Sequence, residues 1–192
     1  MKRMTDTVSS TTGRFTRMDE STEEQWQVIM AESMEHQPRV AERVLGMLRS
    51  LADITDGFAT DQLVHSLQTA TRAEEAGASD EMVVASLCHD IGKAVSVPNH
   101  PKIAAEILKP YVSEDVYQVI AAHQDFQGRH YYAYMHMDPD ARERYRGESW
   151  FGLAEQFADE WDQTSFDPDY PTNPREQFEP VVRRVFGRVQ RV

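Results

Sequence analysis

Four histidines and one aspartate are spaced along the sequence in a way that could bind metal ions. His89 and Asp90 stand side by side in the stretch ASLCHDIGKAVSVPNH, and His65, His100 and His123 lie before and after them. Imidazole nitrogen suits iron, zinc, manganese and nickel, and a carboxylate can bridge two hard cations. A single helical histidine is more often packed or solvated than bound to a metal, so the prediction rests on the whole set. The sequence therefore predicts a metal site built from these five side chains.

The elements that must position these side chains are predicted to be helices. Apolar residues recur every three or four positions in the segments 21–30, 40–51, 61–77, 79–91, 102–110, 113–123, 148–163 and 175–186, without a convincing alternating strand pattern. The turn GASDE joins the helix of His65 to the helix that ends at His89, so these two helices are expected to lie antiparallel. At a helix end, His89 and Asp90 can flank one point, and Asp90 can then bridge two ions.

Length and composition indicate a single globular domain. The chain has 192 residues, of which 40% are hydrophobic, and it shows no repeat and no low-complexity linker. We expect residues 1–20, rich in Ser, Thr and charge, to form a flexible N-terminal tail. Residues 21–192 are expected to form one all-α bundle. Ser21, with Glu24 three residues later, is typical of a capping box at the start of the first helix.

Charge and composition exclude several classes of partner. The formal net charge of −12 disfavours binding to nucleic acid or to an anionic membrane, because phosphates attract basic surfaces. There is no signal-peptide pattern and no apolar run of the roughly 18 residues that span a bilayer, so we expect a cytoplasmic protein. The lone cysteine, Cys88, fits a reducing compartment and is expected in the core. The sequence leaves the oligomeric state open.

Several other residues are candidates for holding a substrate near the metal site. Lys93 and Arg129 could add positive charge at its mouth, although solvated surface is the alternative for Arg129. Gln62 lies one turn before His65 and could orient a metal ligand or the substrate. The stretch FQGRHYYAYMHMD either lines a pocket over the metals or forms a packed helix face.

The pair His89-Asp90, preceded by the lone His65, resembles the HD-domain superfamily. Its members are all-helical metalloenzymes, mostly phosphohydrolases, whose lone His, His-Asp pair and distal Asp bind one metal. His100 and His123 resemble the two histidines that let some members hold a second ion. Residues 61–93 are most similar to the mixed-valence diiron oxygenases that cleave the C–P bond of 1-hydroxyphosphonates, a group that also includes myo-inositol oxygenase. The resemblance implies an HD-domain helical bundle around a dinuclear metal site.

The resemblance also implies a distal aspartate, for which the stretch FADEWDQTSFD offers three candidates. In the oxygenases this ligand follows a bulky residue near the end of a helix, as Asp162 follows Trp161. Asp159, one helical turn earlier on the same face, is the alternative, whereas Asp167 is expected to open the turn before Pro168. Asp159 also stands where the phosphonate-cleaving enzymes have a basic residue. The oxygenase scaffold can therefore be carried over without the phosphonate substrate.

Two enzymatic functions are compatible with this ligand set. The first is a diiron oxygenase that holds two iron ions (Fe2+/Fe3+) and uses O2 to cleave a small hydroxylated substrate, such as a phosphonate or another anionic compound. Lys93 in HDIGK matches a lysine that contacts the substrate in myo-inositol oxygenase, although the sequence HDIGK also occurs in hydrolases. The second function is a phosphohydrolase that uses Mn2+, Ni2+ or another divalent ion on a phosphate ester or nucleotide. The long similarity over residues 61–93 favours the oxygenase.

Overall fold

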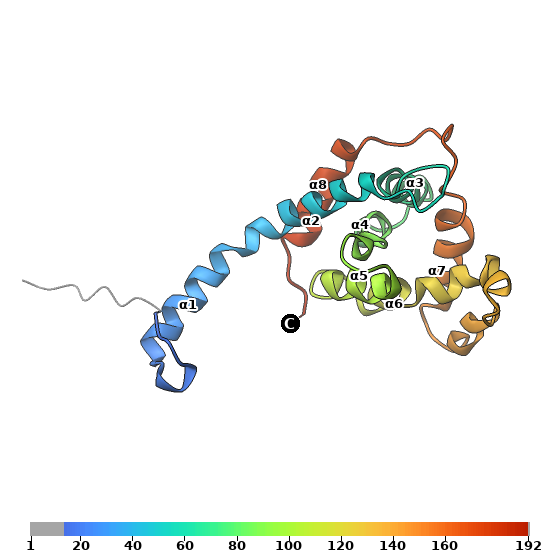
Figure 1. Ribbon diagram of the computed structural model, residues 1–192. Coiled ribbons are helices and arrows are strands. Elements are labelled where there is room, and N and C mark those ends of the chain that lie inside the picture. Colours follow the sequence, from blue (N-terminus) through green and yellow to red (C-terminus); the bar gives the residue numbers. More distant parts are fainter. Residues whose placement is uncertain (1–13, 192) are drawn as a thin grey trace, which may run out of the picture. The chain divides into compact units, whose positions relative to one another are not determined.

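The computed structural model describes residues 14–191, which form helices and connecting turns (Figure 1). Within this range there is no strand, so the prediction of an all-α fold is confirmed. The chain divides into two compact units, Met1–Val40 and Ala41–Val192. Most of the expected N-terminal tail, residues 1–13, lies outside the described residues.

The first unit contains α1 (Glu23–Glu35). The helix begins at Thr22, whose hydroxyl accepts a hydrogen bond from the backbone N–H of Gln25 at 3.4 Å, while the Gln25 side chain accepts one from the N–H of Thr22 at 2.9 Å. This capping box lies one residue later than the predicted pair of Ser21 and Glu24. The reason is that the Ser21 hydroxyl donates to a backbone carbonyl of the preceding turn. None of the described side chains of this unit is buried.

Apart from Val40, the second unit contains all the other helices. They are α2 (Val40–Ser50), α3 (Gln62–Glu75), α4 (Asp80–Cys88), α5 (His100–Leu108), α6 (Glu114–Gln127), α7 (Phe151–Gln156), a π-helix over Phe157–Asp162 that directly continues α7, and α8 (Arg175–Phe186). Between them lie the 3-10 turns Leu51–Asp53, Ile91–Ala94, Val97–Asn99, Gly128–His130, Tyr132–Met135 and Ala141–Tyr145.

Helix α4 forms the centre of this unit (Figure 1). It packs against α3, α6 and α8, and every residue from Met82 to Cys88 is buried. Because α4 is buried on all sides from Met82 onward, the residues that follow its C-terminal end, His89 and Asp90, lie in the interior. Cys88 lies in the core, as the sequence predicts.

Polar side chains start the helix that carries His65 and the helix that His89 follows. The Asp61 carboxylate accepts a hydrogen bond from the N–H of Val64 at 2.8 Å and begins α3. The Ser79 hydroxyl accepts one from the N–H of Met82 at 3.2 Å and begins α4. Gly77, in the left-handed region at φ 74, lies in the turn between the two helices. The short turn lets α3 and α4 pack side by side.

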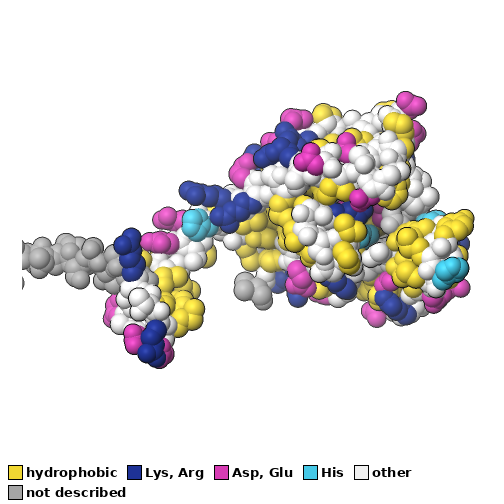
Figure 2. Space-filling view, in the orientation of Figure 1, with side chains coloured by type: hydrophobic (Ala, Val, Ile, Leu, Met, Phe, Trp, Pro, Cys, Tyr) yellow, Lys and Arg dark blue, Asp and Glu magenta, His cyan; other side chains and the backbone are white. Residues whose placement is uncertain are grey.

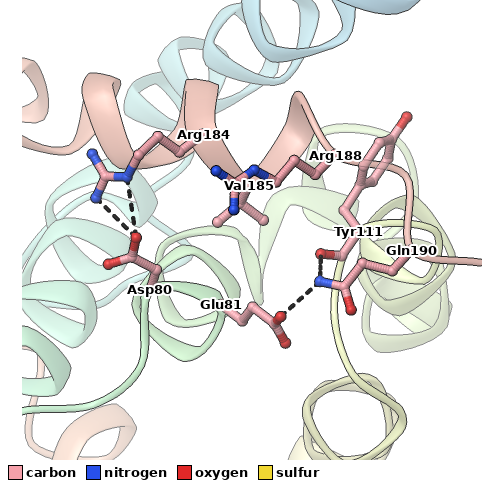
Figure 3. Close-up of a pocket in the computed structure, with 7 residues that line it drawn as sticks. All are labelled: Asp80, Glu81, Tyr111, Arg184, Val185, Arg188 and Gln190. Atoms are coloured by element: carbon pink, nitrogen blue, oxygen red, sulfur yellow. Dashed lines mark hydrogen bonds and ion pairs between the residues drawn. The ribbon is translucent and has the colours of Figure 1, made fainter.

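The surface of the second unit carries interspersed acidic and basic side chains on the face shown in Figure 2. Within residues 14–191, no helix combines the length and the apolar character needed to cross a membrane. A surface pocket lies between the start of α4 and the end of α8 (Figure 3). Its acidic side chains are already engaged, because Arg184 binds Asp80 at 2.9 Å and Gln190 donates to Glu81 at 2.6 Å. None of the predicted metal ligands lines this pocket.

Candidate metal centre

Three of the predicted ligands converge on one point between α3, the end of α4 and the π-helix. The Nε2 atoms of His65 and His89 are 3.0 Å apart, and Oδ1 of Asp162 lies 3.2 Å from the first and 3.4 Å from the second. Ligand atoms bonded at about 2.0–2.2 Å to one ion are separated by distances of this order. All three side chains are fully buried. We call the space between these three residues the inner position.

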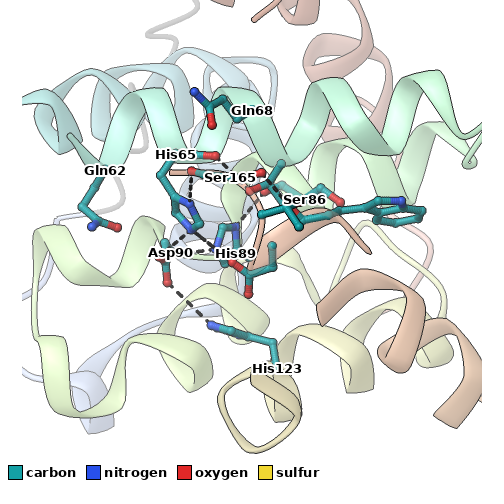
Figure 4. A network of polar contacts seen from close by, with 12 residues as sticks. Gln62, His65, Gln68, Ser86, His89, Asp90, His123 and Ser165 are labelled. Carbon is teal, nitrogen blue, oxygen red and sulfur yellow. Dashed lines mark hydrogen bonds and ion pairs between the residues drawn. The ribbon is translucent and has the colours of Figure 1, made fainter. Parts of the chain in front are cut away.

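His100 and His123 lie on the other side of the Asp90 carboxylate (Figure 4 shows His123 there). Oδ1 of Asp90 is 3.0 Å from Nε2 of His100 and 3.6 Å from Nε2 of His123. Its Oδ2 faces the inner position, at 3.5 Å from His65 and 3.3 Å from His89. We call the space between His100, His123 and Asp90 the outer position. The structure thus brings all the predicted ligands together, with Asp90 between two groups.

Backbone carbonyls orient all four histidine rings. In each ring Nδ1 lies within hydrogen-bonding distance of a carbonyl oxygen, so Nδ1 carries the proton and donates it. The pairs are His65 with Ser165 at 2.9 Å, His89 with Ser86 at 2.8 Å, His100 with Val97 at 2.7 Å, and His123 with Ile120 at 2.8 Å. The lone pairs of all four Nε2 atoms are therefore left to bind an ion, the usual arrangement of metal-binding histidines.

This donor set fits divalent metal ions. With both Nδ1 protons donated to carbonyls, the Nε2 atoms of His65 and His89 face each other at 3.0 Å, which is unfavourable unless a metal ion lies between them or one of the rings takes up a second proton. Both carboxylate oxygens of Asp162 and Oδ1 of Asp90 are buried and have no hydrogen-bond donor. Buried acceptors without donors are costly, and a bound cation removes the cost.

The pKa values in the protein without metal reflect the same arrangement. Burial opposes protonation of His89, but the charges of Asp90 and Asp162 outweigh burial and raise its pKa to about 10. Burial likewise acts against ionisation of Asp162, but the charge of His89 and the contact with His65 lower the pKa of this carboxyl. The pKa of Asp90 is also lowered, because the effect of burial is outweighed by His89 and other histidines. The two carboxylates therefore stay ionised in the interior, where a nearby positive charge stabilises them.

The backbone between α4 and α5 brings Asp90 and His100, two residues of the outer position, close to each other. Asp90 leaves the helical conformation, with φ −101 and ψ 5, directly after His89 at φ −56 and ψ −35. Two adjacent side chains can therefore point at the same centre. Gly92 then lets the turn approach α5 closely, since a Cβ on Gly92 would lie 2.3 Å from the backbone oxygen of His100. No other residue type fits there without moving His100.

Lys93 and Gln62 lie beside the Asp90 carboxylate. Nζ of Lys93 is 2.7 Å from Oδ2 of Asp90 and donates to Oε1 of Gln62 at 2.9 Å. Gln62 is fully buried, and its Nε2 has no hydrogen-bond partner. Gln62, predicted to orient a ligand or the substrate, and Lys93, predicted to contact the substrate, are therefore hydrogen-bonded to each other beside Asp90.

The structure places the alternative ligand Asp159 away from the histidine cluster. Its carboxylate binds Nη1 of the buried Arg142 at 2.9 Å and Nε2 of His130 at 3.1 Å. Arg129, which was expected to add positive charge at the mouth of the site, has its Nη1 4.0 Å from Oδ2 of Asp159, and about half of its side chain is exposed. The π-helix explains the different positions of Asp159 and Asp162, because its wider turn separates residues that an α-helix would place on one face.

The tyrosine-rich stretch after α6 does not form the packed helix face that was one of its two predicted structures. It folds into short 3-10 turns, in which Tyr132 is buried and Tyr134 is 85% exposed. Burial raises the pKa of Tyr131, and the charges of Asp162 and Asp90 contribute to the increase.

Two contacts that orient His65 could not be predicted from the types of the ligand residues. The carbonyl that fixes Nδ1 of His65 belongs to Ser165, and the ring of Phe166 stacks on the imidazole with centroids 4.2 Å apart and planes at 9°. A backbone carbonyl is present at every residue, so its role can be read only from the fold. Phe166 is separated from Asp162 by only three residues, and this proximity is the one clue that the sequence offers.

Comparison with known proteins agrees with the geometry. The family model of the HD domain matches residues 63–167, more than half of the chain, and this range contains all the side chains of the inner and outer positions. A search of curated proteins gives no match. HD domains bind divalent metals and are generally metal-dependent enzymes, often phosphohydrolases. The chain belongs to the HD-domain family.

Proposed function

We propose that this HD-domain protein is a non-haem diiron oxygenase that uses O2 to cleave a small hydroxylated substrate oxidatively. The observation that carries the proposal is the position of Asp90, whose two carboxylate oxygens face the inner and the outer position separately. A carboxylate placed in this way can bridge two ions. The similarity of residues 61–93 to diiron oxygenases favours iron and O2 among the chemistries of two-ion enzymes.

Each group of residues has a distinct role in this proposal. His65, His89 and Asp162 hold one ion in a fully buried position, where their burial excludes water. His100 and His123 hold the second ion, and the 6% exposure of His100 makes the outer position the more accessible one. Bound iron would supply electron transfer to O2 and an open coordination position for the substrate hydroxyl.

The charge of the loaded centre indicates the class of substrate. Two aspartates contribute about −2 and two divalent ions about +4, so the ligands and ions together carry about +2. Lys93 adds a further positive charge beside Asp90. Such a centre attracts an anionic group or a chelating hydroxyl even though the whole chain has a net charge of −12. Lys93 would orient that group through its ammonium.

The reaction needs no external reductant. The substrate loses four electrons as its C–H bond and the neighbouring C–C or C–P bond break, and one O2 accepts them. The oxygen atoms end in the products or in water. The residues of the centre therefore need only bind the substrate, hold the ions and exclude other reactants.

A metal-dependent phosphohydrolase is the alternative function. Membership of the HD-domain family favours it, because the family contains many phosphohydrolases. The same two positions could hold a divalent ion pair that clamps a phosphate, and Lys93 could contact a phosphate oxygen. The choice between the two functions depends on which metal the protein uses and on whether O2 is consumed.

Metal analysis and electron paramagnetic resonance test the proposal. We expect protein purified with iron to hold two iron ions per chain and, when partly reduced, to give a mixed-valence signal below the free-electron g value. A 1-hydroxyphosphonate or a sugar alcohol that acts as substrate should perturb this signal and consume O2. Protein that holds manganese or nickel, gives no such signal and hydrolyses phosphate esters would contradict the oxygenase and support the alternative.

A lysine variant tests the proposed substrate contact. Lys93→Met should keep both ions but weaken the effect of a hydroxylated compound on the signal, because the ammonium beside Asp90 is lost. Lys102→Met is the matched control, since Lys102 is exposed on α5. Equal behaviour of the two variants would show that Lys93 does not contact the substrate.

A further inference from the structure

Three aromatic rings form a stack that begins at the inner position. The imidazole of His65 lies on Phe166 with centroids 4.2 Å apart and planes at 9°, and Phe166 lies on Phe58 at 4.5 Å and 17°. The carbonyl of Ser165 meets the edge of the same imidazole at 2.9 Å from Nδ1. Two consecutive residues thus contact the edge and the face of one metal-binding ring.

The segment that carries Phe166 is bound to the same helix as His65. Gln68 of α3 donates to the carbonyl of Asp167 at 2.6 Å and accepts from its N–H at 3.3 Å. Arg72, one turn later on α3, donates to the carbonyl of Thr164 at 3.1 Å. These bonds flank Phe166 on both sides. Its ring is therefore held in a fixed relation to α3.

Phe58 covers the outer face of Phe166. It follows a tight turn in which Asp56 and Gly57 are both in the left-handed region, at φ 47 and φ 83, and its N–H donates to the carbonyl of Thr55 at 2.9 Å. The turn folds the chain back so that Phe58 reaches Phe166, although 48% of Phe58 stays exposed. Among the described residues, Phe58 is the only aromatic ring besides His65 that stacks on Phe166, and it shields Phe166 from water on that side.

We propose that Phe166, covered by Phe58, is a positioning residue for the metal ligand His65. The hydrogen bond to Ser165 fixes which nitrogen of His65 carries the proton, but the ring can still swing about that bond. Stacking on Phe166 fixes the plane of the ring and so directs Nε2 into the inner position. The inference rests on the proposed function only in that the inner position must bind an ion.

Iron affinity of Phe166 variants tests the proposal. Contacts that orient a metal ligand change metal affinity by about 10–100-fold when they are lost. We expect Phe166→Leu, which keeps apolar volume but removes the ring, to bind Fe2+ at least about tenfold more weakly in anaerobic competition with a chelator. Phe166→Tyr should restore the affinity, because the ring is kept and Phe166 is only partly buried.

The matched control is Phe186→Leu in α8. Phe186 is also an aromatic residue packed on another ring, with its centroid 4.8 Å from that of Tyr111, but it does not contact the metal-binding residues. This variant should lose stability without losing iron affinity. A purely structural role of Phe166 would make the two leucine variants alike.

Each outcome separates the inference from the proposed function. Wild-type protein that binds no ion would refute the metal centre itself. Wild-type protein that binds iron, together with Phe166→Leu of unchanged affinity and unchanged resonance signal, would overturn only the positioning role. If Phe166→Leu does not fold, Phe58→Ala decides, because uncovering Phe166 should let a chelator remove iron faster from the inner position. An unchanged removal rate would overturn the proposal.

Discussion

Replacement of Gly92 by alanine should empty the outer position and leave the inner position intact. An added Cβ would lie 2.3 Å from the backbone oxygen of His100, against about 3.4 Å for an ordinary contact, so the two segments must separate by about 1.1 Å. His100 contacts Asp90 at 3.0 Å through Nε2, and metal–ligand distances tolerate only about 0.2 Å. A shift of this size therefore removes one ligand of the outer position.

The loss of stability expected for Gly92→Ala follows from the cost of overpacking. Forcing an extra methyl group into a packed contact costs about 1–3 kcal/mol, and each kcal/mol lowers the melting temperature of a domain of this size by about 2–4 °C. The assay is the number of iron ions per chain together with the thermal unfolding of the metal-free protein. We expect one ion per chain and no O2-dependent activity for Gly92→Ala.

The control substitution is Gly152→Ala. Gly152 lies in α7, and a Cβ there would meet nothing within 4 Å, so this variant should keep two ions and should not lose stability. If Gly92→Ala also bound two ions and unfolded like the wild type, the reasoning from the close approach to His100 would be refuted.

Three further predictions follow from the same geometry. His100→Ala should bind one ion instead of two and lose all activity, and an active variant with one ion would contradict the two-ion assignment. Asp159→Asn should keep both ions but unfold more easily by about 1–3 kcal/mol, because the buried Arg142 loses its ion pair with Asp159 and keeps only the one with Glu155; loss of an ion would make Asp159 a ligand. In the metal-free protein the pKa of His89 is raised from 6.5 to about 10, so its contribution to stability is complete below pH 6.5 and is lost as the pH rises towards 10. A melting temperature of the metal-free protein that rises between pH 6.5 and 10 would contradict the raised pKa of His89. Over the same pH range the metal affinity should rise by up to about tenfold per pH unit, because His89 must lose its proton to bind an ion.

The fold class and the histidine cluster could be predicted because both depend on residue types at helical spacing. The stripes of apolar residues indicated the helices, and the short turn between α3 and α4 implied that His65 and His89 lie side by side. The family model supports the resemblance to HD domains. The capping box of α1 lies one residue later than predicted, since both Ser21 and Thr22 are residue types that cap helices and only the structure shows which one does so.

Other features depend on backbone geometry that residue types do not reveal. A helical pattern places Asp159 and Asp162 on one face, and only the π-helix directs Asp162 to the histidines and Asp159 to Arg142. The stacking of Phe58 on Phe166 joins two loops far apart in the sequence. The two positive φ values before Phe58 have a local signal in the pair Asp56-Gly57, but that pair does not reveal that the turn brings Phe58 to Phe166.

The anchoring of His65 has a consequence for the order of folding. Its contact with His89 closes a loop of 24 residues, whereas its hydrogen bond to Ser165 closes one of 100 residues. Each doubling of loop length adds about 0.6 kcal/mol of closure entropy, so the second contact costs about 1.2 kcal/mol more than the first. The pairing of α3 with α4 can therefore precede the arrival of the segment with Asp162. An ion at the inner position would act as a cross-link that closes this long loop last and holds it closed.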